Sequence, residues 1–124
     1  MINKTVLRNI YNHLTELSST ELQISYWIKG DKGKISSFIE LINSLEDDDF
    51  NLFVDKEASE MNLSAEFARE LKILRGLLNN YDESNKTRIE IINDPKWKEI
   101  GKHAQHVLIY WRNEIGDLLD EDAP

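Results

Sequence analysis

The sequence predicts a mainly α-helical single domain, folded as a bundle of about five or six helices. Three observations support this prediction. First, only two prolines and five glycines interrupt 124 residues, fewer than a β fold with many turns requires. Second, apolar residues recur at every third or fourth position through several segments, which is the spacing of one helix face. Third, Ser, Asp and Pro precede several of these segments, and these residues commonly begin helices.

The length and the composition are those of one globular domain. The chain is 40% hydrophobic and 31% charged, and no repeat or linker divides it, so residues 1–124 are expected to form a single helical domain. The absence of cysteine excludes disulfides and thiolate chemistry, and is consistent with the cytoplasmic location that we predict. No apolar run approaches the roughly 18 residues of a membrane span, and the N-terminal residues lack the apolar core of a signal peptide.

The first predicted helix runs from about Lys4 to Glu16. Its apolar residues recur at helical spacing, so the helix is expected to pack against the rest of the domain along one stripe. That stripe comprises Val6, Ile10, Leu14 and Leu17.

Residues 21–36 are compatible with two structures. Apolar and polar side chains alternate over residues 22–28, as in a half-buried strand, and residues 29–34 form a good turn sequence. Together they predict a short β-hairpin. Ser18 and Glu21 instead have capping-box spacing, which predicts a short helix that ends at Gly30. The sequence favours neither structure over the other.

Two helices are predicted between residues 37 and 60. Ser37 and Glu40 have capping-box spacing, and they begin a helix with one apolar face. The aspartates at 47–49 lie at a break after this helix. One of them is expected to cap a second, short helix, because aspartate accepts hydrogen bonds from the free N–H groups of a helix start. The short helix contains Phe50, Leu52, Phe53 and Val54.

The clearest helix of the middle region follows Asn62 and Ser64, which suit its beginning. A short apolar element at 89–92 comes next, and its type is not defined by the sequence. The apolar stripe of the middle helix comprises Phe67, Leu71, Leu74, Leu78 and Tyr81.

The last and longest helix is predicted to begin at Asp94 and Pro95, with aspartate as the N-cap and proline at the first helical position. It carries two of the three tryptophans, so it is expected to be the main packing partner of the domain. Gly101 suits a close helix crossing, and an acidic tail is expected to fray from about residue 117. The apolar stripe comprises Trp97, Ile100, Ala104, Val107, Leu108, Trp111, Ile115 and Leu118.

The acidic residues are concentrated in two places. From Glu40 to Glu60 there are eight acids and one base, a balance of −7, and from Glu114 to the C-terminus there are five acids and no base. The formal net charge of the chain is −8. This charge argues against direct nucleic-acid binding, because affinity for phosphates comes from clustered lysine and arginine. Clustered acids instead attract a basic protein.

The sequence therefore predicts a small, acidic, bacterial-type protein that is not an enzyme and that binds another protein. By analogy of composition, it suits an inhibitor or immunity protein for a basic partner such as a nuclease toxin, since a nuclease must be basic to hold its substrate. A nucleic-acid mimic, in which carboxylates imitate phosphates, is a close alternative. Acids would steer the partner and aromatic residues would anchor it. The predicted contact residues are Asp47, Asp48, Asp49, Phe50, Phe53, Asp55, Glu57 and Trp27.

No catalytic or cofactor motif stands out, so we assign no catalytic residue, metal or cofactor. The chain has no nucleophile elbow, no phosphate-binding loop and no cysteine nucleophile. Glu99, His103 and His106 lie along one strip of the last helix, and two imidazoles with a carboxylate could bind zinc or iron. That alternative would make the protein a metal-dependent helical enzyme. We expect instead that the strip is the polar flank of an amphipathic helix.

Overall fold

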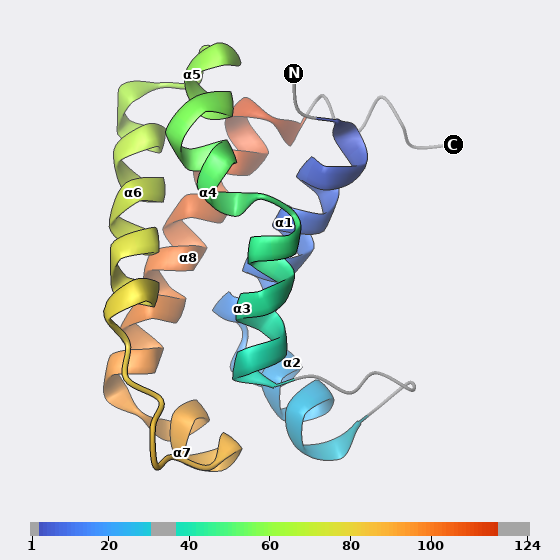
Figure 1. The fold of residues 1–124 in the computed structure, drawn as a ribbon, viewed down its shortest axis with the longest axis vertical. Coiled ribbons are helices and arrows are strands. Elements are labelled where there is room, and N and C mark those ends of the chain that lie inside the picture. Colours follow the sequence, from blue (N-terminus) through green and yellow to red (C-terminus); the bar gives the residue numbers. More distant parts are fainter. Residues whose placement is uncertain (1–2, 31–36, 117–124) are drawn as a thin grey trace.

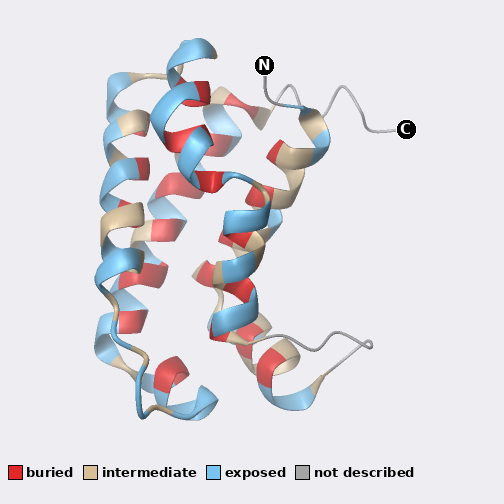
Figure 2. Cartoon of the chain, in the orientation of Figure 1, coloured by how far each residue is buried: buried red, intermediate tan, exposed pale blue. Residues whose placement is uncertain are grey.

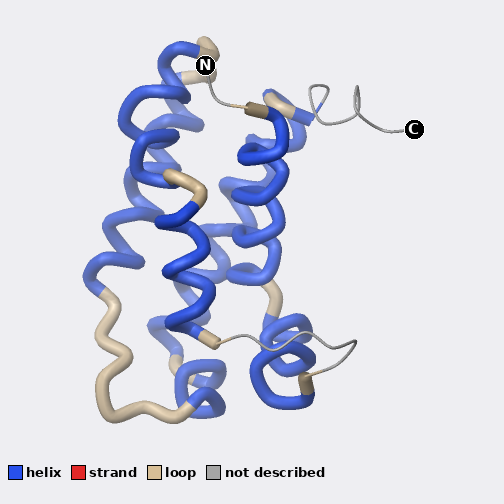
Figure 3. The backbone as a smooth tube through the Cα atoms, turned by 45° about the vertical axis from the view of Figure 1, so that its right-hand side comes forward, coloured by secondary structure: helices blue, strands red, loops and turns tan. Residues whose placement is uncertain are grey.

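The computed structural model describes residues 3–30 and 37–116, and this part of the chain is helical without any strand (Figures 1 and 3). The predicted mainly α fold is confirmed, and the described residues form seven helical segments rather than five or six. They are α1 (Lys4–Ser18); α2 (Thr20–Gln23), which continues as a π-helical turn η1 (Ile24–Lys29); α3 (Phe38–Asp47); α4 (Phe50–Leu52), which continues through the π-helical η3 (Phe53–Glu57) into α5 (Ala58–Glu60); α6 (Ala65–Asn80); α7 (Arg88–Asn93); and α8 (Pro95–Glu114).

The β-hairpin that we considered near residues 21–36 is not supported, because residues 20–29 are helical. The helix begins at Ser19 rather than Ser18, since the Ser19 side chain accepts a hydrogen bond from the Leu22 N–H. It ends at Gly30, whose left-handed backbone (φ 64°) favours glycine. The helix buries Gln23 and Trp27, four residues apart, whereas the predicted strand would have buried the alternating set that ends at Ile28, which is 44% exposed. Residues 31–36, where the turn was predicted, lie outside the described residues.

Three other predicted helix starts are present and depend on local side-chain caps. Ser37 and Ser64 accept hydrogen bonds from N–H groups of the first turns of α3 and α6. Asp94 accepts from the Lys96 N–H, and Pro95 occupies the first turn of α8. The apolar element at 89–92 proves to be the helix α7, which Thr87 and Glu90 begin with a complete capping box.

Helix α8 is the central element of the bundle. It packs along α1 on one side and along α6 on the other, while α3 packs against α1 and η3 against α6 (Figure 1). The predicted close crossing occurs at Gly101, where a Cβ atom would lie 3.3 Å from the carbonyl oxygen of Leu17. None of the described helices combines the length and the apolar composition that crossing a bilayer requires.

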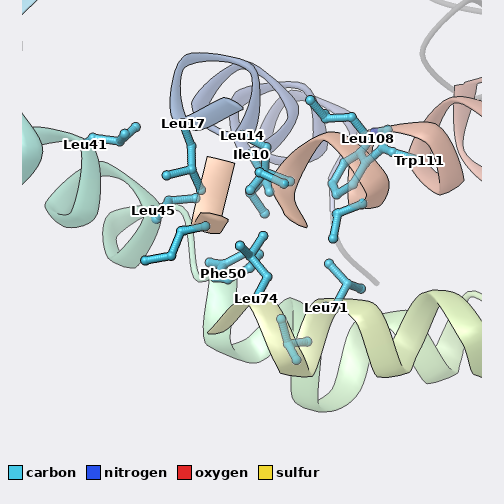
Figure 4. Close-up of a cluster of buried hydrophobic side chains, with 14 of the residues drawn as sticks. Ile10, Leu14, Leu17, Leu41, Leu45, Phe50, Leu71, Leu74, Leu108 and Trp111 are labelled. Atoms are coloured by element: carbon cyan, nitrogen blue, oxygen red, sulfur yellow. The ribbon is translucent and has the colours of Figure 1, made fainter. Parts of the chain in front are cut away.

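The core consists of the inward faces of these helices, which are buried along their length (Figure 2). Side chains from α1, α3, α4, α6 and α8 converge on it, among them Leu14, Leu45, Phe50, Leu74 and Leu108 (Figure 4). The predicted core residues of the last helix from Trp97 to Ile115 are buried, which confirms its placement; Leu118 lies outside the described residues.

Aromatic rings form a cluster around each tryptophan of α8. Near the N-terminus of the helix, the Trp97 ring lies 5.9 Å from Trp27, 5.3 Å from Phe38 and 5.4 Å from Tyr81, measured between ring centroids. Near its C-terminus, the Trp111 ring lies within about 6 Å of rings from three other elements, which are Tyr11, Phe53 and Phe67.

We predict that replacing Trp111 by alanine destabilises the fold strongly, because the side chain is fully buried between α1, η3 and α6. The expected loss is about 3 to 5 kcal/mol of unfolding free energy. Urea unfolding followed by circular dichroism measures it. Ile109→Ala is the matched control, since Ile109 lies on the same helix but is half exposed, and it should change the free energy by less than about 0.5 kcal/mol. Equal losses in the two variants would contradict the central role of Trp111.

Candidate functional site

The best candidate for a functional surface is the turn between α3 and α4, which we call the acidic corner: Glu46, Asp47, Asp49 and Leu52. Helix α3 ends at Asp47, and the chain turns at Asp49 through a left-handed backbone (φ 57°, ψ 42°) before α4 begins. The three acidic side chains are exposed, and none forms a hydrogen bond or ion pair with another described residue. Leu52 stands one turn along and is 46% exposed. The corner therefore combines negative charge that no described cation compensates with an exposed apolar side chain.

Asp48 has a different role, because its side chain turns back onto α1. Its Oδ2 atom lies 2.7 Å from Nε2 of His13, a hydrogen bond in which the imidazole donates, and Asn9 donates more weakly to Oδ1 at 3.4 Å. Both His13 and Asp48 are about one-fifth exposed. Asp48 thus fixes the acidic corner to the N-terminal helix and is not free to meet a partner.

The expectation that one of the three aspartates caps the short helix is wrong. Asp49 occupies the N-cap position of α4, but its side chain makes no capping hydrogen bond. The left-handed backbone at Asp49 directs the chain into the helix, and the Asp49 carbonyl accepts from the Phe53 N–H at 2.9 Å. A capping role therefore does not explain the acids of this turn.

The predicted aromatic anchors lie in the core. Phe50, Phe53 and Trp27 are buried, so none of them can contact a partner in this structure. The apolar residue that does reach the surface of the corner is Leu52, although its neighbours in the short apolar run are buried. The exposure of Leu52 could have been predicted from helical spacing. Residues 50, 53, 54 and 57 share one face of a helix, and Leu52 lies on the opposite face.

The remaining predicted contact residues, Asp55 and Glu57, belong to η3. Asp55 is exposed, but its Oδ1 accepts from Nη1 of Arg75 at 2.6 Å, which joins η3 to α6 and neutralises its charge. Glu57 is only 7% exposed, and its Oε2 has no hydrogen-bond partner among the described residues. Of the C-terminal acids, Glu114 accepts from the N–H and the hydroxyl of Ser64, both at 2.7 Å. The acids beyond it lie outside the described residues.

The strip of Glu99, His103 and His106 does not form a metal site. Nε2 of His103 lies 2.7 Å from Oε2 of Glu70, which comes from α6 rather than α8, although the direction of approach is not that of a hydrogen bond. The rings of His103 and His106 lie 6.3 Å apart, and Glu99 instead lies near Lys102, at 3.8 Å. Across residues 3–30 and 37–116, no three His, Asp or Glu side chains are grouped as a metal ion would require.

Shifted pKa values occur in the link from α6 to α8, where caps and turns explain them. Burial, together with a 2.7 Å hydrogen bond to Asp94, raises the pKa of Tyr81. The same hydrogen bond, followed by one from the Lys96 N–H, lowers the pKa of Asp94. Hydrogen bonds from Ser84 and Thr87 lower the pKa values of Asp82 and Glu90 respectively. These shifts therefore reflect local structure rather than an acid–base site.

The acidic corner is thus the candidate site that the described residues offer. The chain matches no protein-family model, no curated protein and no solved structure.

We predict that Asp48→Ala destabilises the fold while Asp47→Ala does not. Loss of the contacts to His13 and Asn9 should lower the free energy of unfolding by about 1 kcal/mol. A buried hydrogen bond to a charged group contributes more, but this one is partly exposed to water. Asp47→Ala removes no contact between described residues, and the expected change is below about 0.5 kcal/mol. Urea unfolding checks both values. The His13→Ala, Asp48→Ala double variant should lose less unfolding free energy than the sum of the losses in the two single variants. A loss equal to that sum would show that the two side chains do not interact.

We also predict that Tyr81→Phe reduces stability at neutral pH but has less effect in acid. The folded-state pKa of Asp94 is lowered, so its contribution is present above the ordinary carboxyl value of about 4 and is lost as the pH falls through the lower folded value. Phenylalanine removes the donor and moves the pKa of Asp94 back towards that ordinary value. The difference in unfolding free energy between wild type and Tyr81→Phe should therefore become smaller below about pH 4. A difference that stays constant with pH would show that the hydrogen bond does not control Asp94.

Proposed function

We propose that this protein is a non-catalytic binding module whose acidic corner recognises a basic protein. The observation that carries the proposal is the exposure of Glu46, Asp47 and Asp49 without cationic partners among the described residues, beside the exposed Leu52. Where acids are neutralised internally, as Asp55 is by Arg75, little field remains for a partner. At the corner no cation of residues 3–30 and 37–116 pairs with the three acids, so they can raise the rate at which a basic surface binds.

The shape of the corner supports an apolar contact in addition to the charge. A small hollow of about 40 Å³ opens between α3, α4 and α6, with Glu46 at its edge and Leu45, Phe50 and Leu78 among its lining residues. Asn51, Arg75 and Asn79 also line this hollow, so the exposed Leu52 is the main apolar contact that the corner offers. A partner of matching chemistry presents lysine or arginine around an apolar side chain, which would supply affinity while the charges supply orientation.

A nuclease toxin is a partner of this chemistry, since it needs clustered lysine and arginine to hold phosphates. The protein would then act as an inhibitor of the immunity type, covering part of a cationic surface. Mimicry of nucleic acid is less well supported. Asp48 and Glu57 turn inward and Asp55 pairs with Arg75, so the acids available in this segment gather at one turn rather than along an extended row.

The proposal predicts that removing the three charges abolishes capture of a basic partner from a lysate of the source cells. The variant is Glu46→Gln, Asp47→Asn, Asp49→Asn, which keeps the size of each side chain and leaves Asp48 in place. Asparagine also tolerates the left-handed backbone of position 49. Capture by wild type should fall steeply as the salt concentration rises above about 0.1 M, where exposed charges are screened beyond about 10 Å.

The matched control is Glu21→Gln, Glu66→Gln, Glu99→Gln, which changes the net charge equally but at exposed acids on other helices. It should capture the same protein as wild type. Equal capture by the corner variant and the control would assign the attraction to net charge alone. If the captured protein is not basic, or if no protein is captured, the proposed role of the acidic corner is contradicted.

A further inference from the structure

A polar cleft of about 230 Å³ lies between the end of α1, the start of α2 and the first half of α8. Four of its lining residues are buried, namely Leu17, Gln23, Trp97 and Gly101. Lys98 and Lys102 line it from α8, one helical turn apart, and Thr20 lines it from α2. The cleft is built at the close crossing where Gly101 meets the Leu17 carbonyl, so helix packing keeps it open.

The backbone carbonyls at the end of α1, beside this cleft, already accept hydrogen bonds. The last carbonyls of α1 would normally be free, because a helix end leaves them without intrahelical partners. Here Nε2 of Gln23 donates to the carbonyls of Glu16 and Leu17, at 3.0 and 2.9 Å. Oε1 of Gln23 in turn accepts from the Trp97 indole at 3.0 Å. Nε2 of Gln105 donates to the Ser18 carbonyl at 3.1 Å.

The donors, in contrast, are largely available. Lys98 has no ion-pair partner among the described residues, and Lys102 has only a loose 3.8 Å contact with the exposed Glu99. An exposed pair at this distance contributes little and does not hold the ammonium group. None of the described residues that line the cleft is acidic. Two exposed cationic side chains and a hydroxyl therefore line a cleft whose neighbouring α1 carbonyls are already hydrogen-bonded, within a chain of net charge −8.

We propose that this cleft binds a small anion that carries a carboxylate or phosphate group. An anion supplies the acceptors that Lys98, Lys102 and Thr20 lack, and both lysines can reach one charged group because they lie on the same side of α8. This site is independent of the acidic corner, since no helix contributes to both.

The test is a titration of the intact protein with inorganic phosphate and, separately, with succinate, followed by the NMR signal of the Trp97 indole N–H. Sodium chloride at the same ionic strength provides the reference for screening. We expect a saturable shift with at least one of the two anions. Saturation by phosphate alone identifies a phosphoryl ligand, and saturation by succinate alone identifies a carboxylate; either supports the site. In Lys98→Gln, Lys102→Gln the affinity should fall at least tenfold.

The matched control is Lys56→Gln, Lys72→Gln, which removes the same charge from exposed positions outside the cleft and should keep the wild-type affinity. A merely structural role for Lys98 and Lys102, such as offsetting the negative end of α1, predicts lower stability of the cleft variant but no saturable shift in any protein. The proposal is overturned if neither anion gives a saturable shift, or if the cleft variant and the control bind equally well.

Discussion

The burial of Trp97 and Trp111 at opposite ends of α8 is the constraint on which the rest of the structure depends. Each indole is surrounded by rings from other elements, Trp97 by Trp27, Phe38 and Tyr81, and Trp111 by Tyr11, Phe53 and Phe67. Large aromatic side chains contribute most of the packing energy of a small core, so the elements that carry these rings must assemble around α8. The helices α1 and α6 accordingly lie along its two sides, and the shorter helices close the ends.

The same packing accounts for the two surfaces to which we attribute binding. The acidic corner keeps its position because Asp48 is held by His13 on α1, which packs directly against α8. Its neighbours Glu46, Asp47 and Asp49 are then left at the surface by a turn that needs none of them as caps. The cleft at Lys98 and Lys102 exists because Gly101 brings the end of α1 against α8, while Gln23 and Gln105 satisfy the carbonyls exposed there. In both places the polar groups that hold the fold together are hydrogen-bonded within the protein, and charged side chains are left at the surface to bind a ligand.

These surfaces have opposite charge and belong to different helices, which suits recognition of two chemically different ligands. A basic protein would be attracted to the corner, and a small anion to the cleft. Because the chain has a net charge of −8, the cleft is a local exception within a negative field, so its lysines must act at short range. The corner adds to the field of the whole molecule and can act at longer range.

The sequence by itself determined the features that arise from contacts between near neighbours. The amphipathic spacing of α1, α6 and α8 and the caps at Ser37, Ser64 and Asp94 depend on residues within one or two turns, so they were predicted correctly. Only the tertiary structure decided that Trp27 is buried, that Asp48 turns inward, and that His103 meets Glu70 rather than Glu99. Each of these outcomes depends on a partner more than 30 residues away. Local periodicity contains no information about such partners, because packing brings them together only when the helices assemble.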